Sequence, residues 1–301
     1  MATALVFPGQ GAQYIGMGRS LYESFPVVHS FYKTAEKMFG ESFLQTCFYG
    51  PDDVLTQTKV CQPALFLHSV AAVAVLRSLF PEKEHSVAFG LSLGELTALW
   101  SAGVYDFETG LAIVAERSRL MQEACESTNG SMLCLLGGNP DDVDTVCASA
   151  NVYKANLNCP GQIVLSGDVR CIQVARSIAE QMSFKRVLPL NVAGAYHSPL
   201  MESASIGFEK FLRDITFNVP QVQVLSNVTA NVVNDPAVIK DLLVKQIVSP
   251  VLFENCCSRA INIGVSEFIE CGAGKTLSGL IKKIDKSVSV MNFDKSDDYN
   301  I

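Results

Sequence analysis

The segment Gly90-Leu91-Ser92-Leu93-Gly94 holds a serine in the pattern G-x-S-x-G. A short apolar run, residues 87–89, precedes it, and an apolar helical pattern follows from Glu95. In a sharp strand-to-helix turn of this kind the serine hydroxyl stands clear of the backbone, and the following N–H can stabilise an oxyanion. The flanking glycines permit the close backbone approach that such a turn requires. The segment therefore predicts Ser92 as the nucleophile of an acyl-transferring enzyme.

A serine hydroxyl is a weak nucleophile and needs a base within hydrogen-bond reach. The chain has four candidates: His29, His68, His85 and His197. We interpret His68, in an apolar segment, as a core residue, and we expect His85, which follows three charged residues, to face solvent. His197 lies in a loop after a predicted strand, where functional residues are common. We therefore favour His197 as the base, with a structural or capping role in the loop as the alternative.

A helical segment, residues 115–121, carries Arg117 and Arg119 among apolar neighbours. At least one of the two must therefore point inward or along a cleft. A buried guanidinium near a nucleophile can bind a carboxylate through two hydrogen bonds and so hold an acidic acyl group. The alternative is an ion pair with Glu116, Glu123 or another local carboxylate, and the spacing favours this alternative.

Composition excludes several other classes of function. The net charge of −7 argues against general nucleic-acid binding, and no apolar stretch reaches the ~20 residues of a membrane span. The ten cysteines form no C-x-x-C pair and are expected to be reduced, and the histidines are not spaced as metal ligands. We expect no metal and no cofactor. The first apolar strand begins too early to follow a signal peptide, so we expect a cytoplasmic protein, or an organelle stroma or matrix protein if a targeting segment was removed.

The elements that position these residues form two predicted units. Residues 4–7 are a buried strand ending in a Pro-Gly-Gln-Gly turn, residues 87–89 are the nucleophile strand, and residues 107–124 are a helix. Residues 129–193 follow the order β-α-β-β-α-β, which is that of a ferredoxin-like unit. We therefore expect an α/β fold. An α/β-hydrolase-like catalytic subdomain with a parallel sheet spans 1–128 and 194–301, and a smaller ferredoxin-like α+β subdomain, 129–193, is inserted in it.

The chain resembles malonyl-CoA:acyl carrier protein transacylases from residue 4 to about residue 285. Eight segments occur in the order seen in that family: Phe7-Pro8-Gly9-Gln10-Gly11-Ala12-Gln13, Gln62-Pro63-Ala64, Gly90-Leu91-Ser92-Leu93-Gly94-Glu95, Arg117 with Met121-Gln122, Asn158-Cys159-Pro160-Gly161-Gln162, Ala195-Tyr196-His197-Ser198-Pro199-Leu200-Met201, Gln246 with Ser249-Pro250, and Glu270-Cys271-Gly272-Ala273-Gly274. Eight ordered motifs are far more specific than any one of them.

The resemblance implies a ping-pong reaction. Ser92 would attack the thioester of malonyl-CoA, His197 would accept its proton, and the malonyl-serine ester would pass the malonyl group to the phosphopantetheine thiol of holo acyl carrier protein. The pathway implied is fatty acid biosynthesis, although polyketide synthesis uses the same half-reactions and this chain does not distinguish them. In the family a backbone carbonyl orients the histidine, and here that carbonyl would belong to Gln246.

The resemblance also assigns the remaining site residues. The backbone N–H groups of Gln10 and Leu93 would form the oxyanion hole, and Arg117 would pair with the malonyl carboxylate. Tyr196 stands where malonyl-type members commonly have Phe, which favours exclusion of methylmalonyl. Leu91 is a departure, because many members carry His immediately before the nucleophile. Any polar role of that position is absent here, but the retained His197 keeps the general base.

Two further expectations concern partners and rival functions. An acidic carrier protein needs a positive patch on this acidic chain, and helical spacing groups three lysines opposite an apolar face: Lys275, Lys282 and Lys286. A merely solvated helix face is the alternative. The rival functions are a serine esterase or thioesterase, in which water replaces the carrier thiol, and a non-catalytic module that binds carrier protein.

Overall fold

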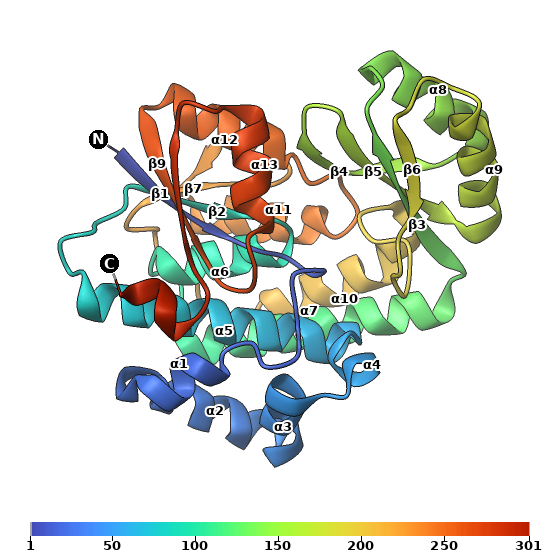
Figure 1. Cartoon of the computed structure of the whole chain (residues 1–301). Coiled ribbons are helices and arrows are strands. Elements are labelled where there is room, and N and C mark those ends of the chain that lie inside the picture. The colour runs from blue at the N-terminus through green and yellow to red at the C-terminus, as the bar shows by residue number, and fades with distance from the viewer. Residues whose placement is uncertain (1, 301) are drawn as a thin grey trace.

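Two separate β-sheets organise the chain in a computed structural model that describes residues 2–300 (Figure 1). The larger sheet has the strand order β10-β9-β1-β2-β7-β8. All neighbours in it pair in parallel except β7 and β8, which are antiparallel. Its strands are β1 (Ala2–Phe7), β2 (Val87–Gly90), β7 (Gln223–Leu225), β8 (Val232–Val233), β9 (Val265–Cys271) and β10 (Ser289–Phe293).

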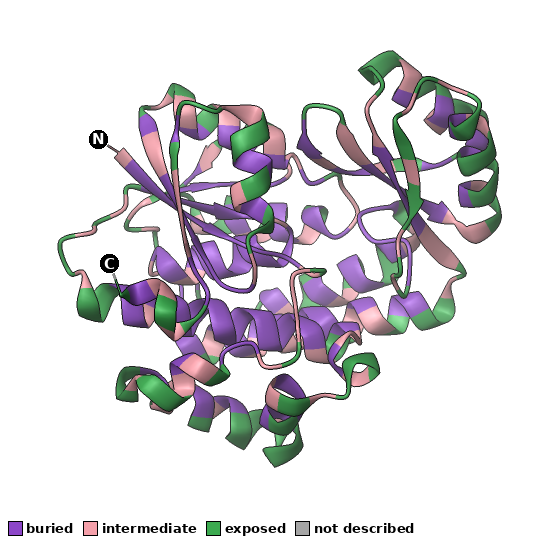
Figure 2. Cartoon of the chain, in the orientation of Figure 1, coloured by how far each residue is buried: buried purple, intermediate pink, exposed green. Residues whose placement is uncertain are grey.

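Both faces of this sheet are covered, as its apolar strands require. Along β1, Leu5 and Phe7 face the core formed with α5 (Thr58–Leu79), α6 (Leu93–Ser101) and α7 (Phe107–Ser127). Ala4 and Val6 alternate with them and face α12 (Phe253–Asn262) and α13 (Thr276–Ile284). Figure 2 shows α5 and the central strands buried almost throughout. The central strands β1 and β2 are therefore held from both sides.

The register of β1 and β2 places two loops side by side. Phe7 is paired with Gly90, so the two strands end at the same level of the sheet. In parallel sheets, ligands bind in the crevice beyond the carboxyl ends of the strands. The loop that contains Gln10 and the turn that contains Ser92 both leave the sheet at this edge. The fold thus brings together two of the predicted site segments.

The smaller sheet is antiparallel, with the order β4-β5-β3-β6. It consists of β3 (Gly130–Leu136), β4 (Tyr153–Cys159), β5 (Gln162–Asp168) and β6 (Arg186–Pro189), with α8 (Pro140–Ala150) and α9 (Val169–Glu180) on one face. Leu133 and Leu135 of β3 pack on those helices, whereas Met132 and Cys134 point to the large core. The uncovered face of the sheet therefore closes against the rest of the chain.

The remaining helices complete the layers around the large sheet. In Figure 1 the N-terminal helices lie beneath α5 and α7. The N-terminal helices are α1 (Arg19–Ser24), α2 (His29–Phe39), α3 (Glu41–Tyr49) and α4 (Asp52–Leu55). The other helices are α10 (Glu202–Leu212) and α11 (Pro236–Gln246), and the 3-10 turns are Pro26–Val28, Pro199–Met201 and Ser296–Tyr299.

Helix α5 is long and apolar enough to cross a membrane by length and composition alone. In the fold, however, 83% of its most apolar stretch is buried against the rest of the chain. It packs between α6, α7 and the large sheet. These contacts are those of a core helix.

The expected fold class is confirmed: the chain is a mixed α/β protein with a sheet of parallel strands and a separate antiparallel sheet. All strands of the smaller sheet lie within 129–193, and the division of the chain into subdomains at those boundaries stays a prediction.

The expectation that His85 faces solvent was wrong. This side chain is half-buried after α5, and burial lowers its pKa to about 4.

Candidate active site

Ser92 occupies a strained backbone position between β2 and α6. Its φ of 54° and ψ of −101° lie outside the regions that residues with side chains normally adopt. A Cβ at Gly94 would overlap the carbonyl oxygen of Phe7, and a Cβ at Gly90 would overlap the backbone of Gly94. Only glycine fits at either position. The turn therefore has the sharp geometry that the motif predicts, and such strain is typical of functional sites.

Asn227, which follows β7, holds this turn in place. Its side-chain oxygen accepts a hydrogen bond of 2.8 Å from the Ser92 N–H, and its side-chain nitrogen donates one of 2.8 Å to the carbonyl oxygen of Gly90. Asn227 is completely buried, so these bonds are shielded from water. The nucleophile turn is thus fixed from a strand that is its neighbour in space but about 130 residues away along the chain.

His197 contacts the predicted nucleophile directly. Its Nε2 lies 2.9 Å from Ser92 Oγ, and its Nδ1 lies 2.8 Å from the backbone carbonyl oxygen of Gln246. A carbonyl only accepts, so Nδ1 carries the hydrogen and Nε2 accepts from the serine hydroxyl. Gln246 is the last residue of α11, where carbonyls lack helical partners. Burial, followed by the nearby Arg117, lowers the pKa of His197 to about 4, which keeps the ring neutral.

Arg117 points inward from α7 and is 1% exposed. Its Nη1 donates to Gln62 Oε1 at 2.6 Å, and its Nη2 donates to Ser92 Oγ at 3.0 Å and to Gln246 Oε1 at 2.8 Å. Its Nε has no partner among residues 2–300. Burial lowers the pKa of the guanidinium to about 10, so it remains charged at neutral pH. No carboxylate within the described chain forms a salt bridge with this side chain.

Arg119 forms the surface ion pairs that were the alternative for these two arginines. It lies half-exposed on the opposite side of α7 and pairs with Glu116 and Glu123. The ion-pair interpretation, which the spacing favoured for these arginines, is therefore wrong for Arg117 and right for Arg119. One arginine enters the core beside the nucleophile and the other stays at the surface.

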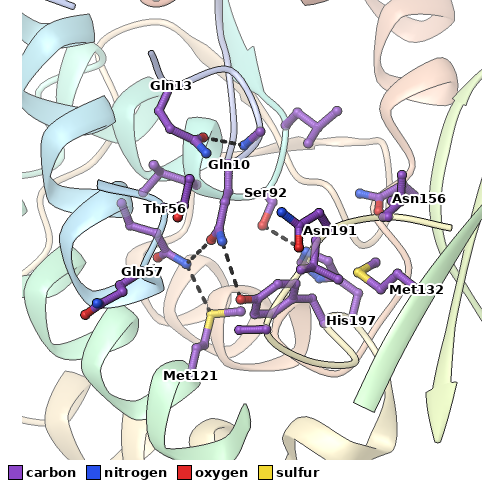
Figure 3. A pocket seen from close by; sticks show the side chains of 18 of the residues that line it. Gln10, Gln13, Thr56, Gln57, Ser92, Met121, Met132, Asn156, Asn191 and His197 are labelled. Atoms are coloured by element: carbon purple, nitrogen blue, oxygen red, sulfur yellow. Dashed lines mark hydrogen bonds between the residues drawn. The ribbon is translucent and has the colours of Figure 1, made fainter. Parts of the chain in front are cut away.

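A pocket of about 470 Å³ opens onto Ser92 and His197, and Arg117 lies behind its lining residues Ser92 and Gln62. Ser92 and His197 face each other at its base, and Met132 and Asn156 of the smaller sheet form its opposite wall (Figure 3). Gln10 borders it as well. Its other lining residues are Gly11, Gln13, Thr56, Gln57, Gln62, Leu91, Leu93, Met121, Gln122, Leu190, Asn191, Val192, Ala193 and Tyr196. The pocket is of a size that suits a small acyl group and the end of its carrier.

Gln10 and Leu93 flank the nucleophile in this pocket. Leu93 is the first residue of α6, so its N–H has no helical acceptor and belongs to the positive end of the helix. Gln10 lies in the neighbouring loop, and its side-chain nitrogen donates to Tyr196 Oη at 3.4 Å. Tyr196 Oη also shares a hydrogen bond of 2.6 Å with Thr58 Oγ1. The tyrosine ring is therefore held against the pocket wall.

The structure places all six predicted site residues in one cluster: Ser92, His197, Gln10, Leu93, Arg117 and Gln246. Sequence reasoning missed Asn227 and Glu95, which lie behind the turn. Glu95 offered a signal, as the one charged residue in the helix Leu93–Ser101. A weaker signal for Asn227 was its place just after a buried strand.

The lysine segment differs from its expected geometry. Leu277, Leu280 and Ile281 are buried as predicted, but α13 ends at Ile284, so Lys286 lies beyond the helix. Lys282 Nζ donates to the carbonyl oxygen of Val288 at 2.6 Å. The candidate docking lysines are exposed: Lys275, Lys282 and Lys286. They do not form one helical stripe.

A serine in contact with a neutral histidine and a buried arginine, in this fold, is typical of an acyltransferase. The model of the acyl transferase domain family matches residues 4–293, and the chain belongs to that family.

Comparison with named proteins shows which members of this family the chain is similar to. A malonyl CoA-acyl carrier protein transacylase from Staphylococcus aureus (strain MRSA252) is 38% identical, over 98% of this chain and 96% of its own length. An acyl carrier protein S-malonyltransferase from Vibrio cholerae superposes with a TM-score of 0.94 at 35% identity, covering 99% of this chain and 98% of that chain. A malonyl-transacylase in complex with a type II PKS acyl-carrier protein has a TM-score of 0.95 at 32% identity, covering 99% and 98%. The chain is a member of the malonyl CoA-acyl carrier protein transacylase family.

Proposed function

We propose that this enzyme transfers a malonyl group from malonyl-CoA to the phosphopantetheine thiol of holo acyl carrier protein through a malonyl-Ser92 ester. One observation carries the proposal. Ser92 Oγ contacts His197 Nε2 at 2.9 Å and Arg117 Nη2 at 3.0 Å, so that a base and a buried cation meet at one nucleophilic oxygen. A base serves any serine acylation, but a buried cation at the same oxygen serves an acyl group with a free carboxylate.

The first half-reaction follows from these contacts. Ser92 Oγ attacks the thioester carbonyl carbon while its proton passes to His197 Nε2. The carbonyl oxygen becomes an oxyanion that accepts hydrogen bonds from the N–H groups of Gln10 and Leu93, a contribution worth about 3 kcal/mol per donor. The intermediate collapses as the carbon–sulfur bond breaks, and His197 returns the proton to the thiolate of CoA. The products are free CoA and a malonyl-serine ester.

The second half-reaction reverses these roles. The pantetheine thiol of the carrier protein gives its proton to His197 Nε2 and attacks the ester carbonyl. The same two N–H groups bind the oxyanion, the carbon–oxygen bond to Ser92 breaks, and His197 protonates the serine oxygen. The hydrogen bond from His197 Nδ1 to the Gln246 carbonyl holds the ring in the required tautomer throughout. A carboxylate partner for the histidine is not needed.

Arg117 gives the proposed preference for malonyl. Its charge is buried, and among residues 2–300 it has no carboxylate partner and its Nε has no acceptor. A malonyl carboxylate would supply the missing negative charge, whereas an acetyl or fatty acyl group would leave the guanidinium unpaired in a closed site. An unmatched buried charge costs several kcal/mol.

The wider role is also part of the proposal. The relatives named as malonyl CoA-acyl carrier protein transacylases, and the one solved with an acyl-carrier protein, support malonyl-CoA and holo carrier protein as partners. We propose fatty acid biosynthesis as the pathway, with polyketide synthesis distinguished by the carrier protein. The bacterial relatives support a cytoplasmic location. We propose no nucleic-acid or membrane partner and no cofactor.

One experiment tests the proposal. The protein is incubated with radiolabelled malonyl-CoA, and label is followed on the protein and on added holo carrier protein. We expect stoichiometric label on the wild type, none on Ser92→Ala, and transfer to the carrier. Label with steady hydrolysis and no transfer would instead indicate an esterase, and absence of label from the wild type would leave only a non-catalytic carrier-binding module.

A further inference from the structure

Glu95 is a buried carboxylate directly behind the nucleophile that the proposed reaction does not use. It lies in the first turn of α6, three residues after Ser92, and is 2% exposed. It does not border the pocket, and its carboxylate faces Gln246 and Asn227 rather than Ser92 Oγ. A buried carboxylate is costly unless hydrogen bonds and an opposite charge compensate it. Its contribution must therefore pass through its neighbours.

Two donors converge on one oxygen of Glu95. Oε2 accepts from Gln246 Nε2 at 2.6 Å and from the Asn227 N–H at 3.0 Å. Within residues 2–300, no lysine, arginine or histidine forms a salt bridge with it. The cation that faces it is Arg117, on the far side of the Gln246 amide, where Nη2 donates to Oε1 at 2.8 Å. A single carboxamide thus separates a buried anion from a buried cation.

This arrangement fixes which way the Gln246 amide points. A carboxylate only accepts and a guanidinium only donates, so the amide NH₂ must face Glu95 and the amide oxygen must face Arg117. The same NH₂ donates to the Ser92 carbonyl oxygen at 3.0 Å. The backbone carbonyl of Gln246 orients His197. One glutamine therefore connects the carboxylate to the nucleophile turn, the base and the buried arginine.

We propose that Glu95 is the positioning residue of this site, which holds Arg117 and His197 in place through Gln246. It also balances the charge of Arg117 without contacting the guanidinium directly. The inference rests on the proposed transfer of a malonyl group. A carboxylate in direct contact with the guanidinium would compete with the malonyl carboxylate. A carboxylate one amide away lowers the cost of the buried cation and leaves the guanidinium Nε without a partner among residues 2–300.

The titratable groups around Glu95 give the proposal a pH signature. Burial raises the pKa of Glu95 to about 7, so the carboxylate is ionised at pH 8.5 and mostly protonated at pH 5.5. Burial also raises the pKa values of Tyr105 and Cys256, which stay neutral over this range. Arg117 and His197 titrate outside it, with pKa values of about 10 and about 4. A step in activity near pH 7 therefore belongs to Glu95.

The test measures single-turnover labelling by radiolabelled malonyl-CoA at pH 8.5. The variants are Glu95→Gln, Gln246→Met and the double variant, with Glu270→Gln as the matched control. Glu270 is an equally buried carboxylate on β9 that accepts from N–H groups at the start of α13, away from the pocket. We expect Glu95→Gln to lower the acylation rate about 10- to 100-fold without weakening malonyl-CoA binding. The control should acylate at the wild-type rate.

The double variant tests whether Glu95 acts through Gln246. If it does, the double variant loses no more activity than the more severe single variant, because the two changes break the same connection. Independent contributions would multiply. The wild type should also lose activity as the pH falls through about 7, and Glu95→Gln should lack this step. A protonated glutamate and a glutamine have nearly the same shape, so a packing role alone gives no such difference.

The outcomes separate this inference from the proposed function. If Glu95→Gln does not fold, Glu95→Asp retains the charge and should keep the step near pH 7, with a reduced rate because its carboxylate reaches less far. Multiplying effects in the double variant, a wild-type rate for Glu95→Gln, a wild-type rate for a folded Glu95→Asp, or a wild type without the step would each overturn the positioning role. A wild type that malonyl-CoA does not label would instead overturn the proposed function.

Discussion

Replacing Arg117 by alanine should remove the preference for malonyl while leaving much of the acylation chemistry. The side chain is buried and donates to Gln62, Ser92 and Gln246, so the free enzyme holds the guanidinium in a fixed place. In the proposed reaction, a malonyl carboxylate would add to these contacts a charge pair shielded from water. Acetyl-CoA lacks that carboxylate, so its acylation should depend on Arg117 only through the hydrogen bond to Ser92 Oγ.

The size of the effect follows from the burial of the pair. Breaking a buried ion pair by removing one partner costs about 3–5 kcal/mol. At about 1.4 kcal/mol per tenfold change, this corresponds to a loss of roughly two to three and a half orders of magnitude in kcat/KM for malonyl-CoA. Loss of one hydrogen bond to Ser92 Oγ costs about 1.5–3 kcal/mol. The middles of the two ranges differ by about 1.8 kcal/mol, so the ratio of malonyl to acetyl transfer should fall by roughly 20-fold.

The assay compares initial rates of Ser92 labelling by malonyl-CoA and by acetyl-CoA. Arg119→Ala is the control, because Arg119 lies two residues away on α7 but pairs with carboxylates at the surface. Surface ion pairs contribute only about 0–1 kcal/mol to stability, so this variant should keep both the fold and the wild-type ratio. If Arg117→Ala remains folded and loses activity equally with both substrates, the arginine does not recognise the carboxylate.

Three further predictions concern the same pocket. Below the step near pH 7, labelling of the wild type should hold a plateau and then fall near pH 4, where His197 becomes protonated. A histidine with an ordinary pKa of about 6.5 would instead lose activity near pH 6.5 and leave no plateau. Labelling rates from pH 3.5 to 9, with circular dichroism to check the fold, decide between the two. Tyr196→Phe should still exclude methylmalonyl-CoA because the ring remains, whereas Tyr196→Ala should be labelled by methylmalonyl-CoA at a rate at least about tenfold higher. Equal methylmalonyl rates in both variants would contradict a role for the ring. Charge reversal of the exposed lysines Lys275, Lys282 and Lys286 should raise the KM for carrier protein and flatten the salt dependence of that KM. Labelling by malonyl-CoA should be unchanged. An unaltered KM would remove these lysines from the docking surface.

Part of the site was accessible from sequence because it is encoded locally. The Ser92 turn needs only its own glycines, and its neighbours along the chain specify it. The inward direction of Arg117 was also encoded, although the spacing argument missed it. Arg117 falls on the helical stripe that includes Val114 and Met121, both buried, whereas Arg119 falls on the face of its acidic partners. A count of helical positions decides what the residue type alone leaves open.

The rest of the site depends on contacts between distant segments. Asn227 supports the Ser92 turn because β7 is the spatial neighbour of β2, and no local pattern specifies that pairing. The Gln246 carbonyl accepts a hydrogen bond from His197 because α11 ends beside this histidine, which depends on how the layers pack. The motif order located Gln246 only through the resemblance to a family. The role of its side chain, in contrast, required the positions of Glu95 and Arg117.

The same contacts explain why leucine is acceptable before the nucleophile. A serine hydroxyl has one hydrogen to donate and two lone pairs. Ser92 Oγ donates to His197 and accepts from Arg117, so one lone pair remains, and it must stay free to attack the thioester. A polar side chain at position 91 would have no further bond to make to this oxygen in the resting site. Leu91 instead lines the pocket, and its N–H donates to the carbonyl oxygen of Phe7 at 3.0 Å. The backbone at this position therefore ties the nucleophile turn to β1, and its side chain supplies apolar wall.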